Sequence, residues 1–251
     1  MFRTGLVSVT FRNKTIDEII ALAAKNGINS IEVGSDIHAP RDNIAECRRI
    51  AILAKDYGID IISYGSYYKL GSGEDFSEYI EAAKALGTKN IRIWAGTSGS
   101  NNVDEVTYKS LVTEAYRCAE NAKEAGLTIS FEYHGNTLTD TSESALRLMH
   151  ELSHPNAYLY WQPNQNRNTD FNIEALKTVL PYVLNVHVFA WNVIDKKIIR
   201  YPLCDYAEAW KKYLDILSTS DRSHNLLIEF VKEDSDDSFI ADSATLNAWL
   251  K

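Results

Sequence analysis

Cysteine is scarce in this sequence, with three residues among 251. Cys47, Cys118 and Cys204 are odd in number and widely spaced, so they provide neither a disulfide framework nor a CxxC metal-binding motif. We expect them to be free thiols in the core or at the surface.

Long apolar runs are also absent. No stretch approaches the ~20 consecutive apolar residues that a membrane-spanning helix needs. The N-terminal segment MFRTGLVSVTFRNKT has an apolar run that is too short, and too interrupted by charge, for a secretory signal. We therefore expect a cytoplasmic protein that does not bind a membrane.

Positive charge is in deficit, because 26 lysines and arginines accompany 34 aspartates and glutamates and give a formal net charge of −8 at pH 7. Nucleic-acid binding depends on basic side chains that neutralise phosphates and release counterions. The charge balance therefore argues against a nucleic-acid partner. With 45% hydrophobic residues, the chain can bury the core of one barrel or of two smaller domains.

No linker rich in proline, glycine or serine divides the chain. Short segments rich in β-forming residues alternate instead with longer segments in which apolar residues recur every three or four positions. The predicted strands are 4–11, 30–34, 59–65, 90–96, 127–134, 157–162, 183–191 and 225–231. The predicted helices are 15–27, 41–58, 75–87, 103–126, 141–153, 172–180, 206–218 and 238–251.

Four glycines, Gly27, Gly58, Gly87 and Gly126, lie where a left-handed residue is expected to end a helix. Eight strand–helix units in a chain of this length are typical of a closed parallel barrel, whereas a doubly wound open sheet normally has fewer strands. We predict an α/β fold, a single (β/α)8 TIM barrel over residues 1–251.

Polar side chains lie at the ends of four consecutive predicted strands. Glu132 and His134 end the fifth, Gln162 the sixth and Glu229 the eighth, while His187 lies in the seventh. Barrel enzymes carry their chemistry at this edge, and side chains two positions apart on a strand share a face. The oxygen donors with one imidazole suit Mn²⁺, Mg²⁺ or Co²⁺, and less well Zn²⁺. The sequence predicts a divalent metal site; hydrogen bonding among these side chains without metal is the alternative.

The segments FEYHGNT, NVHVFAW and LLIEF, supported by SIEVG and IRIWAG, resemble the xylose-isomerase-like barrels over essentially the whole chain. That family includes sugar-phosphate isomerases and epimerases, ketose 3-epimerases, hydroxypyruvate isomerase, inosose dehydratase and endonuclease IV. The resemblance implies a metal held by Glu132, His187, Glu229 and the residue after strand six. That residue is Gln162 instead of the usual Asp, and Gln165 stands at the position of a following His. One negative charge is therefore missing from the implied ligand set.

The resemblance also implies an activity. Glu132 and Glu229 would serve as acid and base beside a carbonyl, with the metal stabilising an enediolate, so we expect a metal-dependent isomerase or epimerase of a sugar or keto-sugar, with or without a phosphate. The same groups could eliminate water, as in a dehydratase of an inosose-like substrate. A non-catalytic carbohydrate-binding barrel is the third alternative. Endonuclease activity is disfavoured because histidines are few and the protein is acidic. Related barrels are often dimers or tetramers, so a homo-oligomer is an open alternative.

Further residues near the predicted strand ends are candidates for substrate binding. His134 could bond a substrate hydroxyl, and Arg200 a carboxylate or phosphate. Aromatic side chains pack against sugar rings, and Tyr68 and Lys69 lie in a glycine-containing loop after strand three. The predicted set is His134, Trp161, Trp191, Tyr68, Lys69 and Arg200, and each of these residues could instead have a purely structural role.

Overall fold

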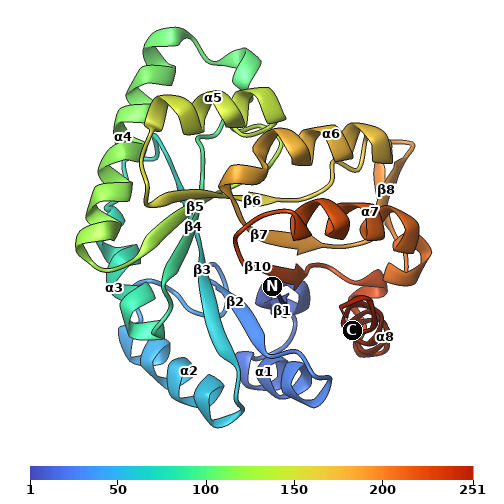
Figure 1. Ribbon diagram of the computed structural model, residues 1–251. Helices are drawn as coiled ribbons and strands as arrows, with labels where there is room; N and C mark the ends of the chain where they lie inside the picture. Colours follow the sequence, from blue (N-terminus) through green and yellow to red (C-terminus); the bar gives the residue numbers. More distant parts are fainter. Residues whose placement is uncertain (251) are drawn as a thin grey trace.

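The computed structural model describes residues 1–250 and shows eight parallel strands closed into a barrel with helices around it (Figure 1). Around the barrel the order is β1-β2-β3-β4-β5-β6-β7-β10, and β10 pairs with β1 to close the sheet. The barrel strands are β1 Phe2–Val7, β2 Ser30–Gly34, β3 Asp60–Lys69, β4 Asn90–Trp94, β5 Thr128–Glu132, β6 Ala157–Trp161, β7 Val183–Val188 and β10 His224–Ile228. The predicted TIM barrel is confirmed.

Eight α-helices in the described part of the chain cover the outside of the barrel (Figure 1). They are α1 Ile16–Lys25, α2 Ile44–Asp56, α3 Phe76–Leu86, α4 Glu105–Glu124, α5 Ser142–Leu152, α6 Thr169–Val179, α7 Ala207–Ser218 and α8 Asp236–Trp249. The four glycines predicted to end helices have φ between 69° and 74°, as a left-handed C-terminal residue requires. None of these helices is long and apolar enough to cross a membrane.

Alternate residues along each barrel strand face either the surrounding helices or the inside of the barrel. Outward-facing residues such as Ile91, Ile93 and Phe131 pack with the helices in one large apolar core. The inside of the barrel is more polar: Ser63 donates to Asn90 Oδ1 at 3.1 Å, and Asn90 Nδ2 donates to Ser130 Oγ at 2.8 Å. The polar interior continues upward to the carboxyl ends of the strands.

Several predicted strands end earlier than expected, among them the first and the seventh. The first ends at Val7, because Ser8–Phe11 form a 3₁₀ turn in which Ser8 Oγ accepts a hydrogen bond from the Gly34 amide at 2.9 Å. The seventh ends at Val188, and Trp191 already belongs to a separate hairpin.

The hairpin consists of β8 Trp191–Ile194 and β9 Lys197–Arg200, which pair only with each other. It was not predicted, because its turn residues, Asp195 and Lys196, lack the glycine that usually marks a tight hairpin. Both have positive φ, 50° and 64°, as a type I′ turn requires.

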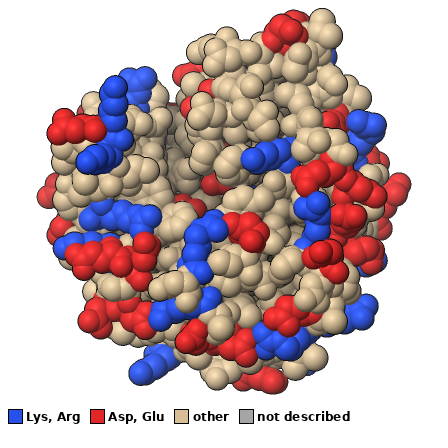
Figure 2. Space-filling view, turned by 180° about the vertical axis from the view of Figure 1, so that it is seen from behind, with Lys and Arg blue, Asp and Glu red and all other residues tan. Residues whose placement is uncertain are grey.

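Charged side chains of both signs lie on the surface (Figure 2), and the three thiols lie in the core or at the surface as expected. In the view of Figure 2, lysine and arginine side chains are interspersed with aspartate and glutamate, and the surface is hollowed between two lobes. Cys47 and Cys118 are buried, Cys204 is exposed, and all three are free thiols.

Candidate active site

A cavity of about 1000 Å³ opens at the carboxyl ends of the barrel strands. Glu132, Gln162 and Glu229 line it from three different strand ends, and the hairpin contributes Trp191 and residues 198–200. The cavity therefore lies where a (β/α)8 enzyme carries its active site.

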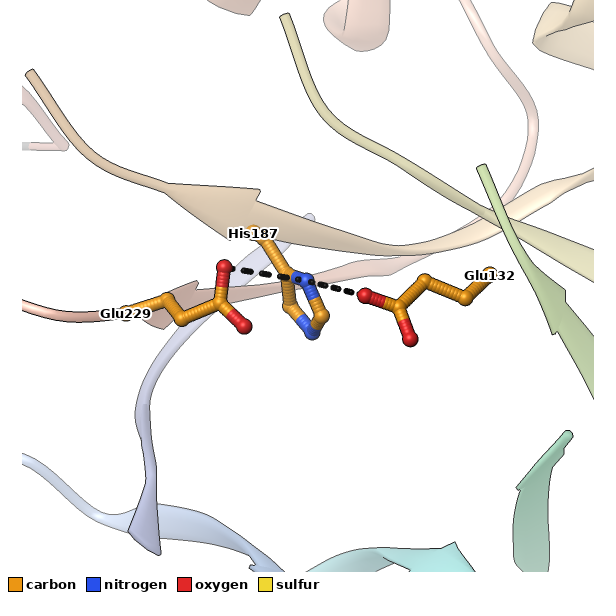
Figure 3. A group of neighbouring side chains, drawn as sticks. All are labelled: Glu132, His187 and Glu229. Carbon is orange, nitrogen blue, oxygen red and sulfur yellow. Dashed lines mark ion pairs between the residues drawn. The ribbon is translucent and has the colours of Figure 1, made fainter. Parts of the chain in front are cut away.

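Two carboxylates and an imidazole meet inside this cavity (Figure 3). Glu132 ends β5, His187 lies in β7 and Glu229 follows β10, and one donor atom of each lies within 4.8 Å of the others. His187 lies between the two carboxylates, with its Nδ1 3.8 Å from Glu132 Oε1 and 3.5 Å from Glu229 Oε2. All three side chains are buried.

The fourth predicted ligand joins this group. Gln162 Oε1 lies 3.0 Å from His187 Nδ1. An ion bound ~2.1 Å from its ligands holds neighbouring donor atoms about 3.0 to 3.5 Å apart, so three of the spacings around His187 approach what one cation requires. The structure brings together the four residues predicted as metal ligands, and their donor set fits a divalent ion.

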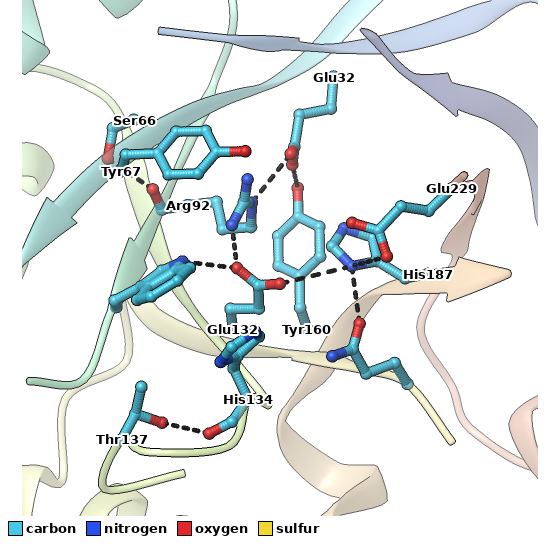
Figure 4. Close-up of polar contacts among 12 residues, drawn as sticks. Glu32, Ser66, Tyr67, Arg92, Glu132, His134, Thr137, Tyr160, His187 and Glu229 are labelled. Atoms are coloured by element: carbon cyan, nitrogen blue, oxygen red, sulfur yellow. Dashed lines mark hydrogen bonds and ion pairs between the residues drawn. The ribbon is translucent and has the colours of Figure 1, made fainter. Parts of the chain in front are cut away.

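A buried ion-pair network lies directly beneath these residues (Figure 4). Arg92 on β4 donates from Nε to Glu32 Oε1 at 2.9 Å and from a terminal nitrogen to Glu132 Oε2. Glu32 on β2 also accepts from the Tyr160 hydroxyl at 2.6 Å, and Glu132 Oε2 accepts from Trp94 Nε1 at 2.7 Å. The network thus connects four strands below the cavity.

Gly65 on β3 makes room for this network. A Cβ atom at Gly65 would lie 2.7 Å from Glu32 Oε1 and 2.9 Å from a terminal nitrogen of Arg92. Both distances are too short for nonbonded atoms, so the buried ion pair depends on the absence of a side chain at this position.

Burial and neighbouring charges give these groups distinct protonation states. Burial raises the pKa of Glu132, but the electrostatic interactions with Arg92 and His187 outweigh this effect. The pKa of Glu132 therefore lies below its ordinary value. Burial, followed by the charge of Glu132, raises the pKa of Glu229 well above its usual range. Burial lowers the pKa of His187 to about 4, so its imidazole is neutral at neutral pH, the state that ligates metals.

We expect the affinity for Mn²⁺ to rise with pH. The raised pKa of Glu229 means that the metal-free protein holds a proton which the ion must displace, whereas neutral His187 adds no such requirement. Isothermal titration calorimetry in buffers of different ionisation enthalpy counts the protons that are released when Mn²⁺ binds. The Glu229→Gln variant should release fewer protons than the wild type. An affinity that is constant between about pH 6 and pH 8 would contradict this expectation.

Three of the predicted substrate-binding residues, His134, Trp191 and Arg200, line the cavity. The His134 ring stacks on Trp94 with centroids 4.6 Å apart, and its Nδ1 lies 2.7 Å from the Gly135 carbonyl oxygen. Because a carbonyl oxygen only accepts, Nδ1 carries a hydrogen, and in the neutral form of the ring Nε2 then has a lone pair. Arg200 forms an ion pair with Asp234.

The other three residues do not line the cavity, which corrects those predictions. Trp161 points outward, because Tyr160 beside it points inward, and it packs against Trp210 and Tyr213 of α7. Tyr68 also faces the helices and donates its hydroxyl to Glu114 at 2.7 Å. Lys69 is half-buried, and its Nζ lies 5.0 Å from the Trp94 ring centroid.

Sequence reasoning missed Glu32 and Arg92 as parts of the site, whereas Tyr67, in the loop predicted after strand three, was a candidate for lining the pocket. The first two lie in SIEVG and NIRIW, where a single charged residue interrupts a buried strand, and that signal could have marked them. Tyr67 has φ of 56°, and its ring, not that of Tyr68, borders the cavity. Its left-handed backbone could not be read from the strand pattern.

Comparison with known proteins places this geometry in a family. The family model described as xylose isomerase-like TIM barrel matches residues 20–189. A 3-dehydroshikimate dehydratase from Bacillus anthracis is 29% identical over 164 residues, which cover 61% of this chain and 58% of that relative. The match therefore spans less than two thirds of the relative's length.

Solved structures share the fold over their whole length. The probable 3-DHS dehydratase AsbF from Bacillus anthracis superposes with a TM-score of 0.80 at 19% identity, covering 98% of this chain and 99% of that chain. An L-ribulose 3-epimerase superposes with a TM-score of 0.74 at 17% identity, covering 100% and 95%. Because the family model matches more than half of the sequence and the barrel is closed, the chain belongs to the xylose isomerase-like TIM barrel family.

Proposed function

We propose that this protein is a divalent-metal-dependent lyase that removes water from a small hydroxylated keto acid of the 3-dehydroshikimate class. The observation that carries the proposal is the unequal pair of cavity carboxylates. Glu132 Oε2 accepts from both Arg92 and Trp94, which fixes Glu132 as an anion, whereas neither donor contacts Glu229. Two carboxylates in such different surroundings are suited to different tasks. The sequence similarity to a dehydratase supports the same reaction class.

Glu132, Gln162, His187 and Glu229 would hold the ion. When bound, a divalent cation would polarise the substrate carbonyl and offset the negative charge that develops as the adjacent proton leaves. Three carboxylates and one guanidinium lie in and below the site, so the ion would also balance their excess negative charge.

Glu229 is the residue suited to move the proton. It takes the proton from the carbon next to the carbonyl and returns it to the hydroxyl on the following carbon, which leaves as water. One C–H and one C–O bond break, and a C=C bond forms. His134, with its Nε2 lone pair and its place on the cavity wall, accepts a hydrogen bond from a substrate hydroxyl. Arg200 is available for the substrate carboxylate through the nitrogens that Asp234 leaves free.

Isomerisation or epimerisation of a keto-sugar, the activity expected from the sequence, is the second candidate. The two carboxylates lie on opposite sides of His187, and a two-base reaction would need them on opposite faces of the substrate (Figure 3). Glu132 would then have to accept a proton while it remains bound to Arg92 and Trp94, and this cost places the reaction second.

Direct assay separates these candidates. We expect protein that has been stripped with a chelator and reloaded with Mn²⁺, Co²⁺ or Mg²⁺ to convert 3-dehydroshikimate into an aromatic product with a new ultraviolet absorbance. A parallel panel of ketoses in deuterated water reports proton exchange. Exchange into a ketose without dehydration would favour the epimerase, and ligand binding that is unaffected by the chelator would favour a carbohydrate-binding barrel.

A further inference from the structure

Arg92 is shared between two carboxylates. Its Nε contacts Glu32 Oε1 at 2.9 Å, and a terminal nitrogen contacts Glu132 Oε2. An isolated arginine and carboxylate usually pair through two parallel hydrogen bonds. Here that bidentate pairing is split, so Arg92 uses only one oxygen of Glu132 and leaves Oε1 for the cavity.

Glu32 is itself held in a fixed orientation. Its side chain is fully buried, and its second oxygen accepts from the Tyr160 hydroxyl at 2.6 Å. The absence of a side chain at Gly65 leaves the space in which Glu32 and Arg92 meet. Glu32, oriented by Tyr160, and Glu132 therefore determine where the guanidinium of Arg92 lies.

The free oxygen is the one that faces the candidate metal ligands. Glu132 Oε1 lies 3.8 Å from His187 Nδ1, whereas Oε2 is occupied by Arg92 and Trp94 (Figure 4). If Glu32 were neutral, the Arg92 guanidinium would have Glu132 as its remaining anionic partner in the network. Bidentate pairing would then draw both oxygens of Glu132 toward β4 and away from His187.

We propose that Glu32 is a positioning residue for the metal site: by engaging Arg92 from below, it keeps one oxygen of Glu132 free to bind a divalent cation. The inference rests on the metal-dependent function proposed above. It assigns Glu32 no contact with the ion or the substrate.

The test is the affinity of the purified protein for Mn²⁺, measured by calorimetric titration. We expect Glu32→Gln to weaken binding about tenfold or more, in the range known for residues that orient metal ligands. The double variant Glu32→Gln, Arg92→Gln should recover much of this loss, because the competing guanidinium is gone. Glu114→Gln is the matched control: Glu114 also accepts from a tyrosine hydroxyl but lies on α4 outside the barrel, so it should bind Mn²⁺ as the wild type does.

A second readout separates positioning from general loss of structure. The visible spectrum of the Co²⁺-loaded protein reports the ligands around the ion, and Glu32→Gln should change it while Glu114→Gln does not. Equal Mn²⁺ affinity in wild type and Glu32→Gln would overturn the inference and leave the proposed function intact. A wild type that binds no divalent ion would overturn both. If Glu32→Gln does not fold, Glu32→Asp takes its place. We expect this variant to bind Mn²⁺ several-fold more weakly than the wild type. Unchanged Mn²⁺ affinity would again overturn the inference.

Discussion

Glu229→Gln is expected to lower kcat for dehydration by about 10³-fold or more, even at saturating metal. Glutamine can still offer an oxygen to a cation, but it cannot accept the proton that leaves the substrate carbon. The raised pKa of Glu229 and its position on the cavity wall make it the carboxylate best suited to this transfer. Steady-state kinetics together with metal analysis of the same samples separate loss of the base from loss of the ion.

A matched substitution is available on the outside of the barrel. Glu208→Gln on α7 removes an exposed carboxylate and should leave kcat unchanged. If Glu229→Gln retained kcat within about tenfold of wild type at full metal occupancy, Glu229 would not be the base. The proposed mechanism, in which Glu229 alone takes and returns the proton, would then be wrong.

Arg92→Met is expected to cause the largest loss of stability among single substitutions in the barrel interior. Methionine fills similar space but leaves Glu32 and Glu132 buried without their shared cation. Breaking a buried pair from one side typically costs about 3–5 kcal/mol, which corresponds to roughly 10 °C in Tm for a chain of this size. Thermal and urea unfolding of metal-free protein measure the change.

Arg49→Met is the control for this substitution. Arg49 also bridges two carboxylates, Asp17 and Glu46, but its side chain is 45% exposed. Solvent-exposed ion pairs contribute about 0–1 kcal/mol, so Tm should change by a few degrees at most. Equal losses in the two variants would show that burial of the Arg92 network does not contribute to stability in the way proposed.

Much of the candidate site could be predicted because it follows from local patterns. Alternation of strand and helix segments indicated the barrel, and the barrel identified the strand ends as the place to look. Glu132, Gln162 and Glu229 lie near the ends of short apolar runs and His187 lies within one, so their convergence could be predicted without knowing a single contact. Their chemical roles remain predictions.

The misplaced aromatic residues show that nearness in sequence to a strand end does not place a side chain in the cavity. Trp161 and Tyr68 are close in sequence to cavity residues, yet each points to the opposite face of its strand. Parity places Trp161 outward once Gln162 is placed inward, so this error was avoidable. The face of Tyr68 follows the same alternation, because Ser63 and Gly65 face the barrel interior, so Tyr67 points inward and Tyr68 outward.

The sequence by itself determined the fold class and the polar donors at the strand ends, because both depend on spacing along a single segment. Only the tertiary structure decided how Glu32, Arg92, Tyr160 and Glu132 pair, and how the β8–β9 hairpin borders the cavity. Those contacts join residues up to 128 positions apart. They depend on the register of strands in a closed barrel, and no single segment specifies that register.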